Sequence, residues 1–373
     1  MTNSTRDLLP EGLEDRLPQA TAAATRITRA IMDVMDAHGY DRVQPPTIEF
    51  EQSLASRMAG IQSRRMFRFV DPASLRMMAL RSDVTPQVGR IAATRMSANP
   101  RPLRLCYNGQ ILTIKGDGLD PVRERLQLGA ELIGSDSVAA AAEVVAVAVE
   151  ALVAAGAQGV SVDFTMPELV GELAAGPWPL APDALEAVRT ALDAKDAGAL
   201  AAAGGQAYLP LLYATGPLDS AIERLAALDV GGVLDERIAA LRSIAGRVGH
   251  AARLTLDPTE RHGFEYQSWF GFTIFADGLR GAVGRGGTYR ILGPAGAQAE
   301  PATGFSLYPD PLIATLAAQE APRPLLFLPL GHDAAVAAAL RGEWRTVAAL
   351  SEADDAVALG CTHRLAGGLV EAV

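Results

Sequence analysis

The sequence predicts an α+β fold, in which an antiparallel sheet is flanked by helices and carries a helical insertion and a small α/β C-terminal tail. Two observations favour this class. The strand-like runs at residues 252–256, 263–275 and 280–283 are joined by tight turns rather than by helices, which is typical of antiparallel sheets. Residues 175–250 are instead rich in alanine and show helical periodicity, so we expect them to form the insertion.

The N-terminal part begins with an irregular arm and an amphipathic helix at residues 18–38, whose apolar side chains recur at helical spacing. A short strand at residues 42–44 follows, before a Pro-Pro break. Residues 66–81 are predicted to form a hairpin that turns at Asp71-Pro72. A helix at residues 85–98 can accept Pro86 in its first turn.

The middle of the chain alternates between strands and helices. Short apolar runs at residues 78–80, 103–107 and 126–132 predict three strands. A helix at residues 138–155 and a buried strand at residues 160–164 come next. We therefore expect residues 78–137 to supply the centre of the sheet.

The C-terminal part contains a strand at residues 303–307, preceded by a glycine-rich break at residues 284–287. We expect a core domain of residues 1–317 and a separate small α/β domain of residues 318–373, which begins with a linker. The small domain is predicted to be βαβ-like, with these elements in order: strand 325–329, helix 333–341, strand 346–350 and helix 353–359.

Composition excludes several classes of function. The 373-residue chain has a net charge of −10, which disfavours broad nucleic-acid binding because phosphate neutralisation requires a basic face, while a local basic patch stays open. Its two cysteines, Cys106 and Cys361, form no CxxC or Cys/His cluster, so we expect no zinc site. The sequence shows neither an apolar signal segment nor a membrane span, and we expect a cytoplasmic protein.

Polar residues occupy one face of the predicted strand at residues 126–132. Residues separated by an even number point to the same side of a strand, so Gln127, Gly129 and Glu131 share a face. The glycine leaves room between two polar side chains, which is typical of a ligand pocket on an open sheet. A solvated sheet face would show the same pattern, and the spacing alone does not separate the two interpretations.

Several motifs occur together in a fixed order: LRSDVTPQ, RLCYNG, RERLQLGAELIG, RHGFEYQ, GGTYR and GFSLYPDPL. Across residues 5–312 this series resembles the catalytic core of the class II histidyl-tRNA synthetases. It more closely resembles a paralogous family, the regulatory subunits of the short-form ATP phosphoribosyltransferases. The resemblance implies a class II aminoacyl-tRNA synthetase-like sheet.

Three arginines of the synthetases are replaced. By the resemblance, the motif-two arginine position is Thr113, the motif-three position is Pro311, and the histidine-specific arginine position is His262. In the synthetases, the motif-two and motif-three arginines hold the triphosphate of ATP and stabilise charge during adenylate formation. Their loss implies that the chain is not a synthetase and has no catalytic residues of its own.

The amino-acid site is retained in the same comparison. Asp83, Thr85 and Gln127 match the residues that hold the ammonium group of histidine, and Glu131 matches the carboxylate that meets the imidazole. A partly buried cation requires an opposite charge, and an imidazole can donate to a carboxylate. Asp83 is one methylene shorter than the glutamate usual in the synthetases.

Three further residues complete the expected histidine site. Tyr289 of GGTYR matches a tyrosine of the synthetase pocket, and Arg123 lies close to the glutamine-bearing strand. The position that matches the imidazole-contacting tyrosine of the synthetases is Gln267 in this chain. Because Tyr266 is only one residue away, we take Tyr266 as the candidate for that contact.

Each candidate also has a purely structural interpretation. Asp83 and Thr85 can cap a helix, Glu131 can face solvent, and Tyr266 can belong to the core. The glycine pair at residues 286–287 can be a hairpin turn alone. A lone histidine such as His262 is more often structural than catalytic, and no metal-ligand spacing stands out.

The family resemblance implies a regulatory subunit of ATP phosphoribosyltransferase, the enzyme of the first step of L-histidine biosynthesis. Such a subunit would bind the short catalytic subunit, activate it, and mediate feedback inhibition by L-histidine without a cofactor. The family further implies a homodimer within a hetero-octamer, and a chain that does not bind tRNA. The alternatives are a divergent histidyl-tRNA synthetase or other adenylate-forming ligase, and a stand-alone histidine-sensing module.

Overall fold

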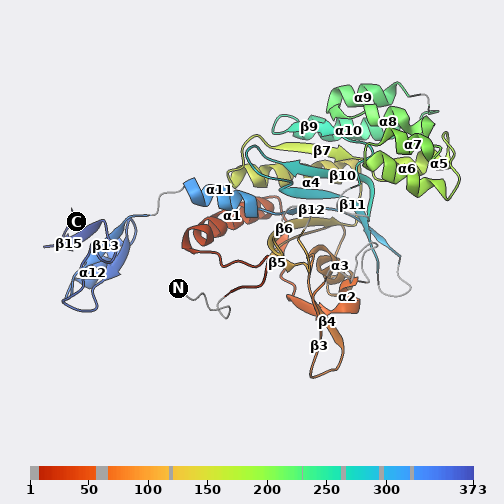
Figure 1. Ribbon diagram of the computed structural model, residues 1–373. Coiled ribbons are helices and arrows are strands. Elements are labelled where there is room, and N and C mark those ends of the chain that lie inside the picture. The colour runs from red at the N-terminus through yellow and green to blue at the C-terminus, as the bar shows by residue number, and fades with distance from the viewer. Residues whose placement is uncertain are drawn as a thin grey trace. The chain divides into compact units, whose positions relative to one another are not determined.

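The chain is divided into two compact units, Met1–Thr315 and Leu316–Val373. The structure, a computed structural model, describes residues 8–55, 66–116, 121–228, 230–261, 266–293, 298–319 and 323–373. Figure 1 shows the order of the elements along the chain.

The first unit is built on a nine-stranded sheet with the order β1-β5-β6-β12-β11-β10-β7-β9-β8. Its pairs are antiparallel except for β1–β5 and β7–β9, which are parallel. The predicted α+β class with a largely antiparallel sheet is therefore confirmed. The strands are β1 (Asp41–Arg42), β5 (Leu103–Leu112), β6 (Glu124–Ile133), β7 (Ser161–Thr165), β8 (Gly216–Pro217), β9 (Arg253–Leu256), β10 (Gln267–Phe275), β11 (Gly284–Ile291) and β12 (Glu300–Leu307).

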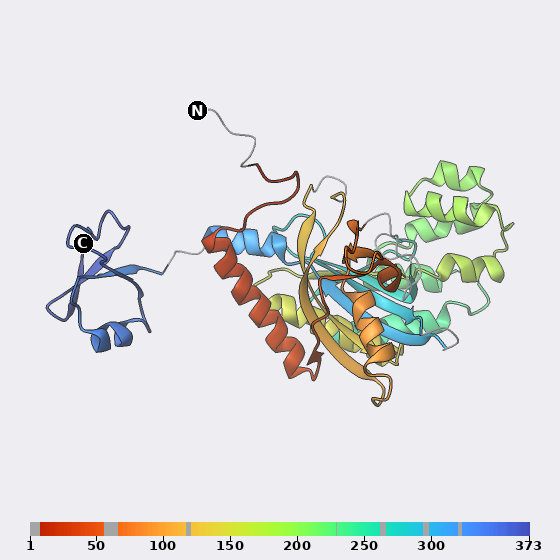
Figure 2. The ribbon, with the colours of Figure 1, turned by 90° about the horizontal axis from the view of Figure 1, so that it is seen from below.

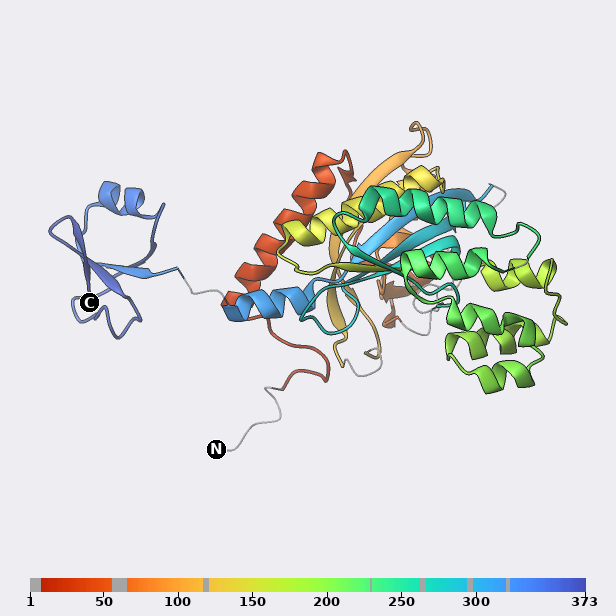
Figure 3. The same ribbon diagram turned by 90° about the horizontal axis from the view of Figure 1, so that it is seen from above.

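One face of this sheet is covered by the long helices α1 (Pro18–Ala37), α4 (Val138–Ala154) and α10 (Asp235–Val248), which Figure 3 shows running across it. The alanines and valines of α4 are small enough to let it pack closely between its neighbours, and most of them are buried. None of the helices in the described ranges combines the length and the apolar character that crossing a membrane requires.

Helix α4 begins at a well-formed cap. The Ser137 side chain accepts a hydrogen bond from the Ala140 backbone N–H at 3.2 Å. Replacing Ser137 with alanine removes this acceptor, and we expect a loss of about 1 kcal/mol in the free energy of unfolding. Thermal unfolding of the two proteins would measure it. A threonine at this position should retain most of the stability, and equal losses in both variants would rule out the cap as the cause.

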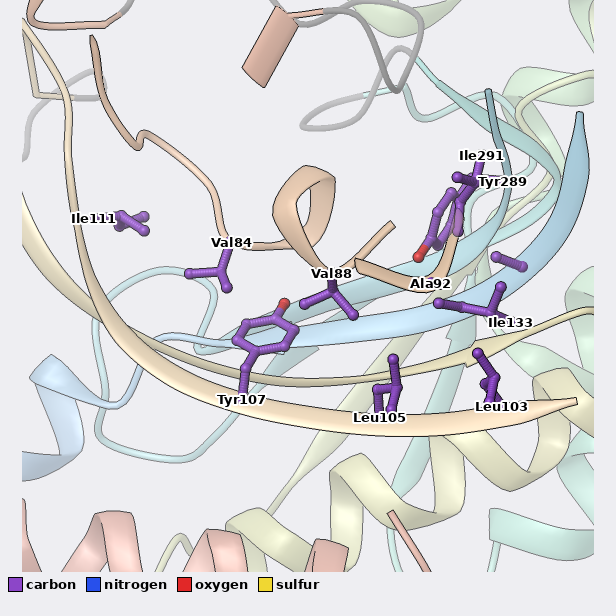
Figure 4. Close-up of a cluster of buried hydrophobic side chains, with 11 residues drawn as sticks. Val84, Val88, Ala92, Leu103, Leu105, Tyr107, Ile111, Ile133, Tyr289 and Ile291 are labelled. Atoms are coloured by element: carbon purple, nitrogen blue, oxygen red, sulfur yellow. The ribbon is translucent and has the colours of Figure 1, made fainter. Parts of the chain in front are cut away.

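The opposite face of the sheet carries α3 (Thr85–Thr94) and a small sheet of β2 (Ile48–Phe50), β4 (Met77–Leu80) and β3 (Arg68–Val70), next to α2 (Glu51–Ala55). These elements lie on the near side in Figure 2. In Figure 4, Val84, Val88 and Ala92 pack over side chains of β5 and β11. The predicted hairpin is confirmed, and the Asp71 carboxylate accepts hydrogen bonds from the backbone N–H groups of Ala73 and Ser74 in its turn.

The helical insertion is also confirmed and begins somewhat earlier than expected. It is anchored by Tyr208, which is fully buried and donates its hydroxyl to the Trp178 carbonyl at 2.6 Å. Figure 1 shows these helices gathered beside the β7–β9 end of the sheet. They are α5 (Leu169–Ala175), α6 (Ala184–Asp193), α7 (Ala197–Ala202), the 3₁₀ helix η3 (Gln206–Tyr208), α8 (Leu209–Tyr213) and α9 (Leu218–Ala226).

Two expectations around β11 are wrong. Residues 280–283 form no strand, because Gly281 has φ +72° within the turn that joins β10 to β11. The glycines at 284–287 do not break the strand and do not form a hairpin turn, since they lie inside β11. A Cβ at Gly286 would lie 2.4 Å from the Phe272 ring, so close packing within the sheet requires glycine there.

The second unit begins within α11 (Asp310–Gln319). Its parallel strands β13 (Leu325–Leu328) and β14 (Arg345–Ala348) are joined by α12 (Ala334–Leu340), as the βαβ prediction requires. The predicted helix at residues 353–359 is wrong. Asp354 and Asp355 accept hydrogen bonds from nearby backbone N–H groups, which stabilises turns instead. Strands β15 (His363–Ala366) and β16 (Leu369–Ala372) then complete a four-stranded sheet.

Candidate functional site

Strand β6 lies at the centre of a buried group of polar side chains. Gln127 is fully buried and Glu131 is 1% exposed, so the interpretation of this face as solvated is wrong. Both side chains point to the face that α3 covers, because β6 alternates between this face and the face covered by α4. We call this face of the main sheet the network face.

Gln127 connects β6 to the beginning of α3. Its Oε1 accepts from the Val84 backbone N–H at 2.9 Å. Its Nε2 donates to Asp83 Oδ1 and to Ser306 Oγ, each at 2.8 Å. These contacts fix the amide orientation and hold the Asp83 carboxylate above the sheet.

Tyr107 of β5 is the most highly connected hydroxyl of the group. It lies 3.0 Å from Thr85 Oγ1 and 3.0 Å from Ser306 Oγ, and it donates to Glu131 Oε1 at 3.2 Å. A Cβ on Gly129 would lie 2.4 Å from this hydroxyl, so the space that the glycine leaves is filled by Tyr107. Tyr107 was not predicted as a site residue. The only signals for it are its place in RLCYNG and its strand phase.

Glu131 accepts from two tyrosines. Tyr289 donates to Oε2 at 2.6 Å, and Tyr107 donates to Oε1. A Cβ on the opposite residue, Gly304, would lie 1.6 Å from Oε2, so glycine is required there to admit the carboxylate. The pKa of Glu131 is raised to about 8, chiefly by burial and also by the charge of Asp83, although hydrogen bonds from Tyr289, Thr85 and Tyr107 act to lower it.

Asp83 combines a structural and an electrostatic role. Its Oδ1 accepts from the backbone N–H of Thr85, the first residue of α3, at 3.0 Å, although the N-cap residue itself is Val84. Burial raises the pKa of the Asp83 carboxyl, while hydrogen bonds from Gln127 and Thr85 lower it. Within the described ranges, no arginine or lysine forms an ion pair with Asp83 or Glu131. A ligand that brings positive charge would relieve both carboxyls.

Two aromatic rings border Glu131. Tyr266 meets Tyr289 edge to face, with ring centroids 5.8 Å apart and planes at 76°. Tyr266 also packs against the hydrophobic cluster shown in Figure 4, in agreement with its interpretation as a core residue. The adjacent Gln267 instead donates from Nε2 to the Gly286 carbonyl at 2.7 Å.

We define the polar network as the side chains linked by these hydrogen bonds: Asp83, Thr85, Tyr107, Gln127, Glu131, Tyr289 and Ser306. It contains five of the seven residues predicted for a histidine site, and Tyr266 lies against it. Among the described residues, no group of three or more His, Cys, Asp or Glu side chains is placed to hold a metal ion.

Arg123 is not brought to the polar network. Its Nη1 donates to the Glu11 carbonyl at 3.1 Å, and its guanidinium lies over the Phe67 ring, 4.8 Å from the centroid. Its backbone N–H donates to the Gly12 carbonyl. In this structure Arg123 therefore fastens the N-terminal arm rather than a ligand.

The positions of the replaced synthetase arginines are only partly described. The Thr113 backbone N–H donates to the Arg123 carbonyl, and Pro311 lies in the first turn of α11, where its carbonyl accepts from Thr315. Neither position carries a cationic side chain. His262 lies outside the described residues.

Comparison with known proteins matches residues 12–312 to the family model described as histidyl-tRNA synthetase. An ATP phosphoribosyltransferase regulatory subunit of Rhodospirillum centenum is 44% identical, covering 98% of this chain and 96% of its own. Another protein of that name, from Paramagnetospirillum magneticum, is 43% identical over the whole of both chains.

Solved structures show the same fold. A Bacillus halodurans protein described as an ATP phosphoribosyltransferase regulatory subunit/histidyl-tRNA synthetase superposes with a TM-score of 0.81, 21% identity and coverage of 96% of this chain and 97% of its own. The histidyl-tRNA synthetase of Nostoc sp. PCC 7120 gives a TM-score of 0.78 at 16% identity, covering 96% and 90%. The chain therefore belongs to the family of ATP phosphoribosyltransferase regulatory subunits, whose fold is that of the histidyl-tRNA synthetases.

Proposed function

We propose that this protein is the non-catalytic regulatory subunit of a short-form ATP phosphoribosyltransferase and that it binds L-histidine in the polar network. The observation that carries the proposal is a pair of carboxyls, the half-buried Asp83 and the buried Glu131, which belong to one hydrogen-bonded group and have no cationic partner among the described residues. A ligand with two groups able to be positively charged complements such a pair.

The residues suggest how histidine would be held. Asp83, Thr85 and the Gln127 amide present oxygen atoms that suit an ammonium group. Glu131 can accept from an imidazole N–H, and the edge-to-face rings of Tyr266 and Tyr289 offer an apolar border beside it. Thr113 and Pro311 provide no positive charge for a triphosphate, which supports a role in binding rather than in adenylate formation.

Regulation would follow from a difference in affinity. Histidine can inhibit the catalytic subunit through this chain only if one state of the complex binds it more tightly than another. We propose that the catalytic subunit is activated in the state with lower histidine affinity, and that the regulatory chain acts as a homodimer within a hetero-octamer. The proposed partners are the catalytic subunit and L-histidine, in the cytoplasm, with neither tRNA nor membrane.

A thermal-shift measurement tests ligand choice. Histidine at about 100 times its Kd should stabilise the isolated protein by about 2.7 kcal/mol, whereas ATP should leave the Tm unchanged. Histidinol and arginine serve as control ligands, because one lacks the carboxylate and the other lacks the imidazole. A shift with ATP, or none with histidine, would contradict the proposal.

A second experiment separates the proposal from the synthetase alternative. The purified chain should show no histidine-dependent exchange of pyrophosphate into ATP, and it should co-purify with the short catalytic subunit from the native cell. Robust exchange would instead assign the protein an adenylate-forming activity. Failure of the catalytic subunit to co-purify would favour a stand-alone histidine sensor.

A further inference from the structure

Arg285 occupies a position on the network face that no part of the proposed function uses. It lies directly opposite Ser306 across β11 and β12. Ser306 lies opposite Gly129, and Gly129 lies opposite Tyr107. Directly paired residues of antiparallel strands point to the same side of a sheet, so Arg285 extends the row that carries Tyr107 and Ser306.

The Arg285 guanidinium differs from the other partly buried arginines of this sheet. Arg104 pairs with both oxygens of Glu143, and Arg101 pairs with Glu300. The Arg285 side chain is half-buried, and within the part of the chain that the structure describes its guanidinium has neither a hydrogen bond nor an ion pair. Its five N–H donors are thus available to an anion.

The Tyr308 hydroxyl lies within electrostatic range of both the Arg285 guanidinium and the Asp83 carboxyl. Burial raises the pKa of the Tyr308 hydroxyl; the charge of Asp83 raises it further, and the charge of Arg285 lowers it. Tyr308 is therefore close enough to respond to both side chains. The contacts give the same proximity: Gln127 Nε2 donates to both Asp83 Oδ1 and Ser306 Oγ, and Ser306 is paired with Arg285, so both charged side chains lie near Ser306 on the network face.

A free amino acid has the complementary charge pattern. Its ammonium group suits Asp83 and Gln127, but the remaining network residues offer no cation for its carboxylate. The carboxyls of Asp83 and Glu131 would repel that carboxylate if nothing opposed them. Arg125, two residues before Gln127 on the same strand, adds positive charge that acts on both Tyr308 and Asp310.

We propose that Arg285 binds the α-carboxylate of the amino acid whose ammonium group is held at Asp83. The inference rests on the proposed function, because it assumes that the network binds histidine. It adds a requirement that the site recognises the zwitterion of an α-amino acid and not only an imidazole with an amine.

The test combines a substitution at Arg285 with the removal of the carboxylate from the ligand. Arg285→Gln is compared with the unaltered chain for binding of histidine and of histamine, which lacks the carboxylate, by calorimetry. The unaltered chain should bind histidine about 10- to 100-fold more tightly than histamine, the range expected of a charge-assisted hydrogen bond. Arg285→Gln should lose this factor for histidine and leave histamine affinity within about twofold.

Two variants serve as controls. Arg290 lies on the same strand, points to the other face and is exposed, so Arg290→Gln should bind both ligands as the unaltered chain does. Arg285→Lys keeps the charge and should retain part of the preference for histidine. Matching Tm values for Arg285→Gln and Arg290→Gln would show that the fold is intact.

Each contrary outcome has a definite meaning. Equal weakening of both ligands by Arg285→Gln would assign Arg285 a structural role and overturn this inference while leaving the proposed function in place. Unchanged histidine affinity in Arg285→Gln would show that Arg285 does not hold the carboxylate and would also overturn it. If the unaltered chain binds no histidine, the proposed function is itself contradicted, and this inference is overturned with it.

Discussion

Replacing Glu131 with glutamine is expected to weaken histidine binding about 10- to 100-fold, because a neutral amide cannot replace the charge opposite the imidazole. The side chain is buried and accepts from two tyrosines, so the substitution preserves shape while it removes charge. Calorimetry measures the affinity. Glu124→Gln, on the same strand with its side chain on the opposite face, is the matched control and should leave affinity unchanged. Unchanged affinity in Glu131→Gln would remove Glu131 from the site.

In the absence of ligand, the Glu131→Gln variant is expected to have a larger free energy of unfolding than the unaltered protein. The pKa of Glu131 is about 8 in the folded protein against an ordinary value of 4.5, so the unfolded chain loses this proton at lower pH than the folded chain does. A raised carboxyl pKa lowers stability progressively from about pH 4.5 to about pH 8. The advantage of Glu131→Gln should therefore grow over this range, on the order of 3 kcal/mol between about pH 5 and about pH 8. Thermal unfolding at both pH values measures it, and an advantage that falls with pH would contradict the burial argument.

Replacing Gly304 with alanine is the second change with a large expected effect. The new Cβ would lie 1.6 Å from Glu131 Oε2 and 2.9 Å from the Ala130 carbonyl, so the carboxylate must move. We expect a loss of about 1–3 kcal/mol in the free energy of unfolding from overpacking. Histidine affinity should fall at least as far as in Glu131→Gln, since displacement removes the hydrogen bond from Tyr289 together with the acceptor position.

A glycine elsewhere provides the control for this substitution. Gly246 lies in α10 and is exposed, and a Cβ added to it would meet nothing within 4 Å. Gly246→Ala should stabilise the protein by up to about 1 kcal/mol through helix propensity, with histidine affinity unchanged. If Gly304→Ala binds histidine as tightly as Gly246→Ala does, the position of the Glu131 carboxylate does not determine affinity.

The centre of the site could be predicted because strand periodicity is local. An even spacing places Gln127 and Glu131 on one face, and the structure places them there. Tyr107 and Ser306 could not be found in this way, because their contacts depend on the register of β5, β6 and β12, which are separated by long stretches of chain. Register is set by the packing of whole strands and is not visible in any short motif.

The errors have a related cause. Arg123 is adjacent to the candidate site in sequence, but its guanidinium donates to the Glu11 carbonyl of the N-terminal arm and lies over the ring of Phe67, which directly precedes β3. Gly286 lies in a glycine-rich run that predicts a turn, yet the ring of Phe272 from the neighbouring strand requires its small size. In both cases a residue distant in sequence determines the role of a local pattern.

If histidine binds as proposed, the buried carboxyl of Glu131 also determines how many protons accompany it. At pH 7 a group with a pKa of about 8 still holds its proton, while the imidazole of free histidine, with a pKa of about 6.5, is mostly neutral. If histidine binds as proposed, one proton can pass from Glu131 to the imidazole and create an ion pair without exchange with the solvent. Below about pH 6.5 the incoming imidazolium adds a proton that must be released, and above about pH 8 one must be taken up. Histidine would therefore be sensed most strongly, and with least dependence on pH, within the range between these two values.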